Sequence, residues 1–270
     1  MNKQIGFIGL GNMGFGMTAN LLKSGYDVFA FDTDEQKLNT LVKIGALKAN
    51  AVKEIGNSVE TVILCLPHPA ISLEVIFKQN LLSVGSKVKT IIDTSTLTPE
   101  ITEEFYQQLK KQRVNFLCTP MLGGKNAAIK RTIHFLVEGD KEISVSYKKL
   151  LMSMGNQVDF MGAAPAATLT KLAYNICRYG NVATAVEVTK FLGTYTKDTK
   201  AIYNLLVKGS LDNFGQVWKE DIKDMMLEGR PYKPSQIPEK DLTLIVQLAK
   251  KKKLSGKLFT AIREVYKALR

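Results

Sequence analysis

The stretch GLGNMG, at Gly9–Gly14, decides the fold of this chain. It matches the pattern G-x-G-x-x-G, it directly follows the apolar run Ile5–Ile8, and it opens a helical pattern that extends to about Ser24. The six letters alone are a weak signal, but a strand before them and a helix after them are typical of a dinucleotide-binding βαβ unit. A chance glycine-rich turn is the alternative, and this context strongly disfavours it.

Each glycine of this stretch has a physical reason. Gly9 permits a tight turn, Gly11 has no side chain to block a pyrophosphate, and Gly14 lets the helix pack closely on the strand. The N-terminus of the helix presents free N–H groups to an anion. The stretch therefore predicts a loop that binds the phosphates of a dinucleotide.

A carboxylate follows at the distance expected of a ribose ligand. Asp32 lies at the end of the apolar run Val28–Phe31, eighteen positions after Gly14. An acidic residue there accepts hydrogen bonds from the ribose 2′-hydroxyl and repels a 2′-phosphate. No arginine follows it closely, so we expect NAD rather than NADP. Asp32 can also cap the helix expected at Glu35–Ile44, and the two roles are compatible.

Apolar runs and helical patterns alternate up to residue 162, as in a parallel sheet that is buried on both faces. Further strands are expected at Val62–Leu66, Val88–Ile92, Val114–Leu117, Ile133–Val137 and Gln157–Phe160. Helical patterns then dominate, at about Pro165–Gly193, Thr199–Lys208, Gln216–Glu228 and Glu239–Lys252. The expected class is α/β, with an N-terminal Rossmann dinucleotide-binding domain at 1–162 and an all-helical C-terminal domain at 163–270.

The net charge and the composition argue against nucleic-acid-binding and membrane proteins. The net charge is +12, but the lysines are scattered, and the one compact run, Lys250–Lys253, has no aromatic residues within it. A solvated surface is therefore favoured over nucleic-acid binding. No apolar run reaches the roughly 18 residues of a membrane span, and the first residues lack the pattern of a signal peptide. We expect a cytoplasmic protein that binds neither nucleic acid nor a membrane.

The cysteines and histidines predict neither disulfides nor a metal site. Cys65, Cys118 and Cys177 lie far apart, and their odd number argues against a disulfide framework. The two histidines, His68 and His134, form no spaced set of metal ligands. Structural roles are favoured for both histidines, because neither lies in a local acid–base pattern.

The stretch TLTKLAYN, at Thr168–Asn175, contains a second feature of interest. Lys171 and Asn175 are four residues apart, so on a helix they share one face. A helical wheel separates an apolar side from a polar stripe. The apolar side consists of Leu169, Leu172, Ala173 and Ile176, and the stripe of Thr168, Lys171, Asn175 and Arg178. This pattern alone favours a solvated lysine over a catalytic one.

Six motifs along the chain change that balance. They are GFIGLGNMG (Gly6–Gly14), CLPHP (Cys65–Pro69), DTST (Asp93–Thr96), TPMLGG (Thr119–Gly124), KLAYN (Lys171–Asn175) and KDL (Lys240–Leu242). In this order they resemble the β-hydroxyacid dehydrogenase family, which includes the 3-hydroxyisobutyrate dehydrogenases. Each motif alone is a weak match, whereas six in the correct order over nearly the whole chain are a strong signal.

The resemblance implies a fold and a reaction. The fold is a Rossmann domain, a long interdomain helix and a helical domain like that of 6-phosphogluconate dehydrogenases. The reaction is the reversible, NAD-linked oxidation of a small 3-hydroxy acid. Lys171 would be the general acid and base, since a partly desolvated lysine can exchange a proton near neutral pH and stabilise a developing alkoxide. Asn175 would be the second catalytic residue and would hydrogen-bond the substrate.

The resemblance also implies which residues bind the two ligands. The cofactor site would consist of Gly9, Leu10, Gly11, Asn12, Met13, Gly14, Asp32, Leu66, Pro67, Thr96 and Lys240. The substrate site would consist of Ser95, Leu122, Gly123 and Gly124, together with Lys171 and Asn175. No metal is implied. A homodimer or homotetramer is expected, because relatives associate through the region of the long helix.

The chain departs from the family's pattern in the substrate motif, D-A-P-V-S-G-G. Leu122 stands where the motif has serine, and Cys118 stands where it has aspartate. Leu122 removes a hydroxyl donor and adds an apolar wall, which favours a bulkier or less polar substrate. In the later motif G-x-x-G-x-G-x-x-x-K, Gly162 is kept, and Pro165 and Ala167 replace the next two glycines.

Three function classes follow from these observations. A dehydrogenase is favoured, because both Lys171 and Asn175 are retained. A non-catalytic dinucleotide-binding or scaffold protein on the same fold is the alternative, and Leu122 argues weakly for it. An imine reductase is less favoured, because such relatives typically replace the catalytic lysine.

Overall fold

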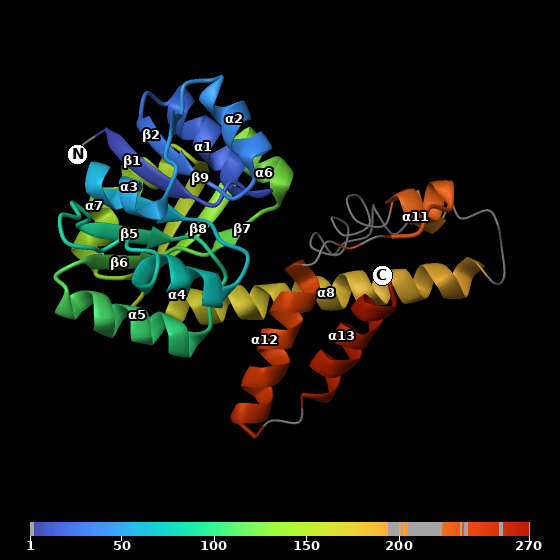
Figure 1. Cartoon of the computed structure of the whole chain (residues 1–270). Coiled ribbons are helices and arrows are strands. Elements are labelled where there is room, and N and C mark those ends of the chain that lie inside the picture. Colours follow the sequence, from blue (N-terminus) through green and yellow to red (C-terminus); the bar gives the residue numbers. More distant parts are fainter. Residues whose placement is uncertain are drawn as a thin grey trace. The chain divides into compact units, whose positions relative to one another are not determined.

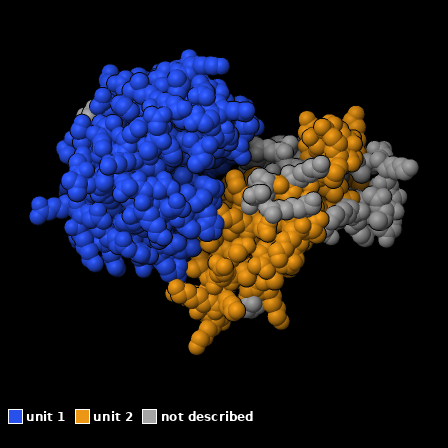
Figure 2. Space-filling view, viewed as in Figure 1, with its two compact units in different colours: residues 1–171 blue, residues 172–270 orange. Residues whose placement is uncertain are grey.

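The computed structural model describes residues 3–193, 200, 202–204, 223–232, 234, 237–253 and 256–269. The chain divides into two compact units, Met1–Lys171 and Leu172–Arg270, which are coloured separately in Figure 2. The division falls within the long helix α8 (Ala166–Gly193), whereas the sequence placed the domain boundary near residue 162. The domain limits 1–162 and 163–270 stay a prediction.

The first unit is built on a nine-stranded sheet (Figure 1). Its strands are β1 (Gln4–Ile8), β2 (Asp27–Phe31), β3 (Leu47–Lys48), β4 (Thr61–Leu64), β5 (Thr90–Asp93), β6 (Asn115–Cys118), β7 (Met121–Leu122), β8 (Ile133–Gly139) and β9 (Gly155–Gly162). The spatial order is β3-β2-β1-β4-β5-β6-β8-β7, with β9 paired to β8. From β3 to β6 all pairs are parallel. This order is that of a Rossmann domain and confirms the expected fold class.

The sheet is not parallel throughout, which corrects the expectation from the sequence. Strand β8 runs antiparallel to β6 and β7, and β9 is again parallel to β8. Only residues 123–132 separate β7 from β8, and they contain the short helix α6 (Lys125–Lys130). A parallel crossover needs a connection of a dozen or more residues, so the chain turns back at this point.

The remaining helices of the first unit are α1 (Gly14–Lys23), α2 (Glu35–Val42), α3 (Val52–Ser58), α4 (Pro69–Phe77), α5 (Pro99–Lys111) and α7 (Lys141–Met152). Four of them begin at a side-chain cap, which for α4 is His68. Asp34 caps α2, Thr98 caps α5 and Asp140 caps α7, each by accepting a hydrogen bond from a backbone N–H of the first turn. These caps explain why the helices begin where they do.

Two apolar layers cover the two faces of the sheet. Phe7 of β1 and Ile63 of β4 belong to one layer, together with Met17 and Leu21 of α1. Ile8, Val62 and Leu64 of the same two strands belong to the other layer, which also contains residues of α3, α4 and α5. Neighbouring residues thus alternate between faces, and the strands are buried on both sides, as the continuous apolar runs predicted.

The second unit is helical in its described part. It contains most of α8, α11 (Lys223–Glu228), α12 (Ile237–Lys251) and α13 (Lys257–Ala268). Its core joins Val182 and Val186 of α8 to Leu242 of α12 and Ile262 of α13. The helices expected at Pro165–Gly193 and Glu239–Lys252 are confirmed.

The other two helices expected in this unit are only partly covered by the structure. Residues 200, 202–204 and 223–228 are helical, and the rest of Thr199–Lys208 and Gln216–Glu228 lies outside the described residues. Within the described residues, every helix is too short or too polar to span a membrane.

Candidate active site

The glycine loop after β1 has the geometry that phosphate binding requires. Gly9 adopts a φ of +97°, and a Cβ there would lie 2.3 Å from the carbonyl oxygen of Cys65. A Cβ at Gly14 would lie 1.9 Å from the oxygen of Gly9, so α1 packs directly on the loop. At Gly11, by contrast, an added Cβ would meet no described atom within 4 Å. The loop is therefore closed at Gly9 and Gly14 and open at Gly11, where a pyrophosphate would approach.

The charge at this helix terminus also suits an anion. Helix α1 has no acidic residue in its first turn. Backbone N–H groups at a helix N-terminus carry a partial positive charge, which a nearby carboxylate would offset. The described residues of the loop therefore fit the pyrophosphate of a dinucleotide.

Asp32 is tied directly to the glycine loop. Its Oδ2 accepts a short hydrogen bond from the backbone N–H of Leu10, and its Oδ1 accepts one from the N–H of Asp34 at 2.7 Å. The cap of α2 is Asp34, which accepts from the N–H groups of Gln36 and Lys37. The expectation that Asp32 caps this helix is therefore wrong, because Asp34 fills that place. Asp32 lies half-buried at the end of β2, beside the loop.

The loops after β4 and β5 are joined to each other. The N–H of Leu66 donates to Ser95 Oγ at 2.9 Å, and the N–H of Ser95 donates to Asp93 Oδ1 at 2.8 Å. Pro67 and Thr96 follow in the same two loops. Strands β1 and β4 are neighbours although they are not consecutive in the chain, so the sheet reverses its order between them. Ligands of such sheets bind outside the carboxyl ends of the strands at this point.

The glycine pair Gly123–Gly124 is held against α1 through the helix α6 that follows it. Gly123 has a φ of +120°, and an added Cβ at Gly124 would meet no described atom within 4 Å. Asn20 Nδ2 of α1 donates to the carbonyl oxygen of Ala128 at 2.7 Å, and a Cβ at Gly16 would lie 2.8 Å from the carbonyl carbon of the same residue. The sequence pointed to neither Asn20 nor Gly16, although a glycine inside a helix is a signal of close packing.

Leu122, the residue that departs from the family's motif, lies in β7 directly before the glycine pair. It is paired with His134 of β8, and its side chain is half-buried. The side chain is thus neither in the core nor fully in solvent.

The polar stripe expected on α8 does not face solvent. Thr168 and Asn175 are only 1% and 2% exposed, whereas Leu169, assigned to the apolar side, is 50% exposed. Lys171 is half-buried. A buried polar group requires a hydrogen-bond partner, and both buried residues have one. The sequence favoured solvent for Lys171 alone, and this side chain is half-buried, whereas Thr168 and Asn175 of the same stripe lie in the interior.

Thr168 is bound by a buried carboxylate that the sequence did not reveal. Glu138 of β8 is 0% exposed, and its two oxygens accept from the N–H of Thr168 at 3.0 Å and from its Oγ1 at 2.9 Å. Tyr106 OH donates to the carbonyl oxygen of Glu138 at 2.6 Å. Burial raises the pKa of the Glu138 carboxyl, and the hydrogen bonds from Thr168 partly oppose this effect. Burial, followed by the charge of Glu138, also raises the pKa of Cys118.

Asn175 has a buried carboxylate partner within the second unit. Its Nδ2 donates to Asp241 Oδ2 at 2.7 Å, and Tyr179 OH donates to the same oxygen at 3.0 Å. Lys240 Nζ lies 3.1 Å from Asp241 Oδ1. Burial, followed by the charge of Asp241, raises the pKa of Tyr179. Asp241 is 1% exposed, and it joins residues that the sequence treated as separate motifs.

His68 and His134 make structural contacts, as the sequence favoured. His68 caps α4 by accepting from the N–H of Ala70, and His134 Nε2 lies 2.8 Å from Asp159 Oδ2. Cys65, Cys118 and Cys177 are thiols rather than disulfide-bonded half-cystines. Across the part of the chain that the structure describes, no group of three or more His, Cys, Asp or Glu side chains is arranged to hold a metal ion.

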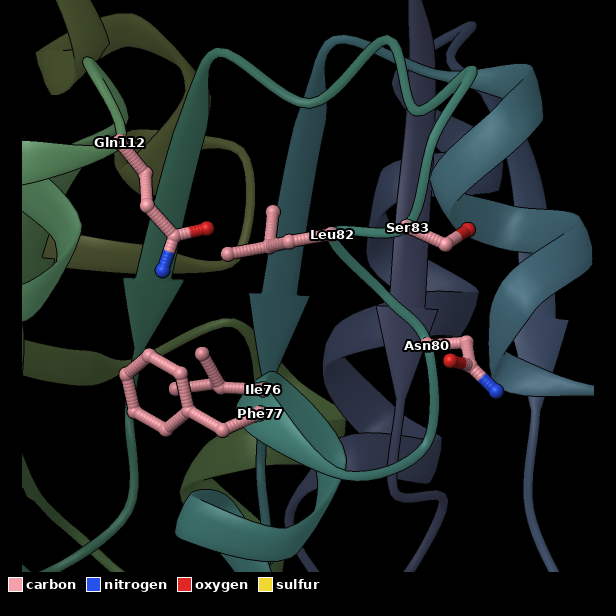
Figure 3. A pocket seen from close by; sticks show the side chains of 6 residues that line it. All are labelled: Ile76, Phe77, Asn80, Leu82, Ser83 and Gln112. Atoms are coloured by element: carbon pink, nitrogen blue, oxygen red, sulfur yellow. The ribbon is translucent and has the colours of Figure 1, made fainter.

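A small cavity of about 120 Å³ lies away from the expected site (Figure 3). It is lined by Ile76, Phe77, Asn80, Leu82, Ser83 and Gln112. The side chains of Leu82 and Gln112 point toward each other across it, above the end of α4. None of the residues expected to bind cofactor or substrate lines this cavity.

The sequence of this chain is similar to a known domain family and to several dehydrogenases. The family described as "NAD binding domain of 6-phosphogluconate dehydrogenase" matches residues 4–162, more than half of the chain. The mitochondrial 3-hydroxyisobutyrate dehydrogenase of Mus musculus is 28% identical over 218 residues, which cover 80% of this chain and 64% of the mouse protein. The probable mitochondrial enzyme of Arabidopsis thaliana is 25% identical over 293 residues, which cover 99% of this chain and 82% of that protein. The chain thus spans about 64% of the length of the mammalian relatives it matches.

Solved structures share the fold. The 3-hydroxyisobutyrate dehydrogenase of Mycobacterium tuberculosis with L-serine has a TM-score of 0.81 at 21% identity, covering 99% of this chain and 94% of that one. An imine reductase variant from Myxococcus stipitatus in complex with NAD+ has a TM-score of 0.66 at 14% identity, covering 99% and 93%. Identities this low support the fold alone. The family match over residues 4–162, together with the dehydrogenase relatives, shows that this chain belongs to the β-hydroxyacid dehydrogenase family and contains its NAD-binding domain.

Proposed function

We propose that this chain is an NAD-dependent oxidoreductase that transfers a hydride between nicotinamide and a small 3-hydroxy acid or its semialdehyde. The observation that carries the proposal is the retention of Lys171 and Asn175 on α8, in a chain whose glycine loop is open at Gly11. Turnover of a panel of 3-hydroxy acids and semialdehydes, followed through the absorbance of the reduced cofactor, tests it.

The proposed mechanism gives each residue one task. A bound nicotinamide supplies the hydride acceptor. Lys171 Nζ takes the proton of the substrate hydroxyl during oxidation and returns it during reduction, and its positive charge stabilises the developing alkoxide. Asn175 orients the substrate, and the hydrogen bond from its Nδ2 to Asp241 fixes the orientation of the Asn175 amide. The N–H groups near Gly123 and Gly124 receive the substrate carboxylate.

The cofactor proposal rests on the glycine loop and Asp32. Gly9, Leu10, Gly11, Asn12, Met13 and Gly14 would bind the pyrophosphate, and Leu66, Pro67, Thr96 and Lys240 would line the rest of the cofactor site. Asp32 would accept from the ribose, because it is fixed beside Leu10. Its negative charge would repel a 2′-phosphate, so NAD is preferred over NADP. Other solved neighbours are in complex with NADP+, so this preference needs a direct test.

Replacing Asp32 by Asn is expected to reverse or remove the preference for NAD. The change removes the negative charge and keeps one acceptor oxygen for the loop. Loss of a hydrogen bond to a charged group, about 1.5–3 kcal/mol, would weaken NAD binding by about tenfold to 100-fold. Dissociation constants for NAD and NADP, measured by calorimetry, check this. The matched control is Asp34→Asn, which removes a neighbouring negative charge but keeps an acceptor for the α2 cap, and it should leave the ratio of the two constants unchanged. A wild-type protein that prefers NADP would contradict the assignment of Asp32.

Leu122 indicates which substrates the protein would prefer. A leucine in place of serine takes away a hydroxyl donor and adds apolar surface beside the glycine pair. We infer that the substrate is bulkier or less polar than 3-hydroxyisobutyrate. Ser95, whose Oγ already accepts from Leu66, is the hydroxyl that remains among the proposed substrate residues.

Leu122→Ser is expected to shift specificity toward small polar acids. One gained hydrogen bond and the loss of an apolar wall should raise kcat/KM for 3-hydroxyisobutyrate, relative to less polar analogues, by about tenfold. Competition assays with wild type and variant on the same panel give this ratio directly. If the wild type already prefers the smallest polar acid, the inference about Leu122 is wrong.

The same panel separates the alternatives. A non-catalytic dinucleotide-binding protein would bind NAD and turn over no substrate. An imine reductase would reduce cyclic imines in preference to semialdehydes, and the likeness to solved imine reductases keeps this class in the panel. A homodimer or homotetramer and a cytoplasmic location stay predictions, and several relatives are named as mitochondrial proteins.

A further inference from the structure

A fully buried carboxylate lies at the first turn of the helix that carries Lys171. Glu138 is 0% exposed, and the partners of its side chain in the described part of the chain are hydrogen-bond donors rather than a cation. Burial of a carboxylate is costly unless hydrogen bonds compensate for the lost solvent. Glu138 has such hydrogen bonds, so the group that it binds, rather than packing, explains its place in the core.

Both oxygens of Glu138 accept from Thr168, and the carboxylate also interacts with the N–H of Ala167 and the thiol of Cys118. The N–H of Thr168 is one of the first amides of α8, which begins at Ala166. The first four N–H groups of a helix have no acceptor within the helix, and a carboxylate beside them also offsets the positive end of the helix dipole. Glu138 thus caps α8 from a neighbouring strand rather than from the preceding loop.

The capped turn is the one that places Lys171. Thr168 and Lys171 are three residues apart, so they lie on neighbouring turns of one helix face. Thr168 is further held by the hydroxyl of Thr102, 3.2 Å away. A shift of the first turn would move the backbone from which Lys171 projects, and small misplacements of a reacting group can reduce rates strongly.

We propose that Glu138 is a positioning residue for Lys171, and that it fixes the first turn of α8 through Thr168. The proposal rests on the acid–base role proposed for Lys171. It assigns Glu138 no contact with substrate or cofactor.

The sheet register places Glu138 opposite the position at which the family's motif has its aspartate. Glu138 of β8 lies directly opposite Cys118 of β6, and opposite residues of an antiparallel pair point to the same face. Cys118 Sγ lies 3.5 Å from the same Thr168 Oγ1 that Glu138 binds. The resembling motif, D-A-P-V-S-G-G, has its aspartate at the position of Cys118. We infer that the Glu138 carboxylate fills the place beside Thr168 that an acid at position 118 would take.

A swap of the two positions tests this inference. The variants are Glu138→Ala, Cys118→Asp and the double variant with both changes, with Glu142→Gln as a control that removes an exposed acid of α7. Glu138→Gln replaces Glu138→Ala if the alanine variant does not fold. Three quantities are measured: hydrogen exchange of the amides of residues 166–171, kcat with the NAD dissociation constant, and the rate at which Lys171 is methylated by formaldehyde and borohydride.

The expected pattern is loss and rescue. In Glu138→Ala, the rate of hydrogen exchange at residues 166–171 rises about tenfold and kcat falls about tenfold. The rate of Lys171 methylation differs from that of the wild type, and the NAD dissociation constant stays within about twofold. Adding Cys118→Asp restores all three. Cys118→Asp alone is destabilised, because two carboxylates then share one buried site. The control resembles the wild type.

A Glu138→Ala variant with unchanged exchange at residues 166–171 and an unchanged Lys171 methylation rate would overturn the proposal. A double variant no better than Glu138→Ala alone would overturn the inference that an acid at position 118 can take the place of Glu138. If the wild type has no turnover on any substrate, the proposed dehydrogenase function fails, whereas exchange and methylation still decide whether Glu138 fixes the turn that carries Lys171.

Discussion

Replacing Lys171 by Ala is expected to lower kcat by about 10²–10⁴ while leaving the dissociation constant of NAD unchanged. A positioned general acid and base contributes a factor of this size. The residues proposed to hold the pyrophosphate lie in the loop after β1, and Lys171 lies on α8. Steady-state kinetics together with cofactor titration therefore separate the loss of chemistry from a loss of binding.

Two controls make the Lys171 result specific. Lys148→Ala removes an exposed lysine of α7 and should leave both constants unchanged. Adding a small primary amine to Lys171→Ala should restore part of the turnover, because it supplies the missing acid–base group. Unchanged turnover in Lys171→Ala would remove this residue from the mechanism.

The second large effect is expected in the glycine loop, where two alanine substitutions should fail in different ways. A Cβ at Gly14 would lie 1.9 Å from the oxygen of Gly9, so Gly14→Ala forces the backbone apart and destabilises the fold by about 1–3 kcal/mol or more. A Cβ at Gly11 meets no described atom within 4 Å, so Gly11→Ala should change stability by less than about 0.5 kcal/mol. The same Cβ occupies the approach of the pyrophosphate and should weaken NAD binding on the order of 100-fold.

Thermal unfolding and NAD titration on the two variants check this pair. The prediction requires a lowered Tm for Gly14→Ala and a nearly wild-type Tm for Gly11→Ala. Tight NAD binding by the Gly11→Ala variant would show that the cofactor does not approach the loop at this point.

The sequence predicts the cofactor half of the candidate site because that half is local. Gly9, Gly11, Gly14 and Asp32 lie within one βαβ unit, where spacing alone fixes geometry. Strands β1, β2, β4, β5 and β6 are predictable for the same reason, since each contains a continuous apolar run, whereas β3 (Leu47–Lys48) is too short to give one. The reversal at β8 is not, because it depends on the length of a connection whose helix α6 is too short to give a clear pattern.

The burial and the pairing of the two carboxylates cannot be predicted from the sequence, because their partners are distant along the chain. Glu138 binds Thr168, 30 residues away, and Asp241 binds Asn175, 66 residues away. A helical wheel counts Thr168 and Asn175 as polar and does not show that they are buried. It contains no information about acids on other elements, and hydrogen bonds to those acids are what allow both residues to be buried.

The two acids also explain how the retained pair on α8 is held. Glu138 fixes the turn before Lys171, and Asp241 fixes the amide of Asn175, each within its own unit. Residues that act on a substrate need neighbours that restrict their rotamers. The family motif records Lys171 and Asn175 but not the contacts that orient them.

The transfer of deuterium from substrate to cofactor tests the central claim most directly. The protein is incubated with NAD and a 3-hydroxy acid that carries deuterium on the carbinol carbon, and the reduced cofactor is analysed by mass spectrometry. A hydride transfer between these two molecules predicts one deuterium in each reduced cofactor, formed by the wild type and at a rate about 10²–10⁴ lower by Lys171→Ala. A wild-type protein that binds NAD and forms no labelled cofactor from any 3-hydroxy acid of the panel would contradict the account.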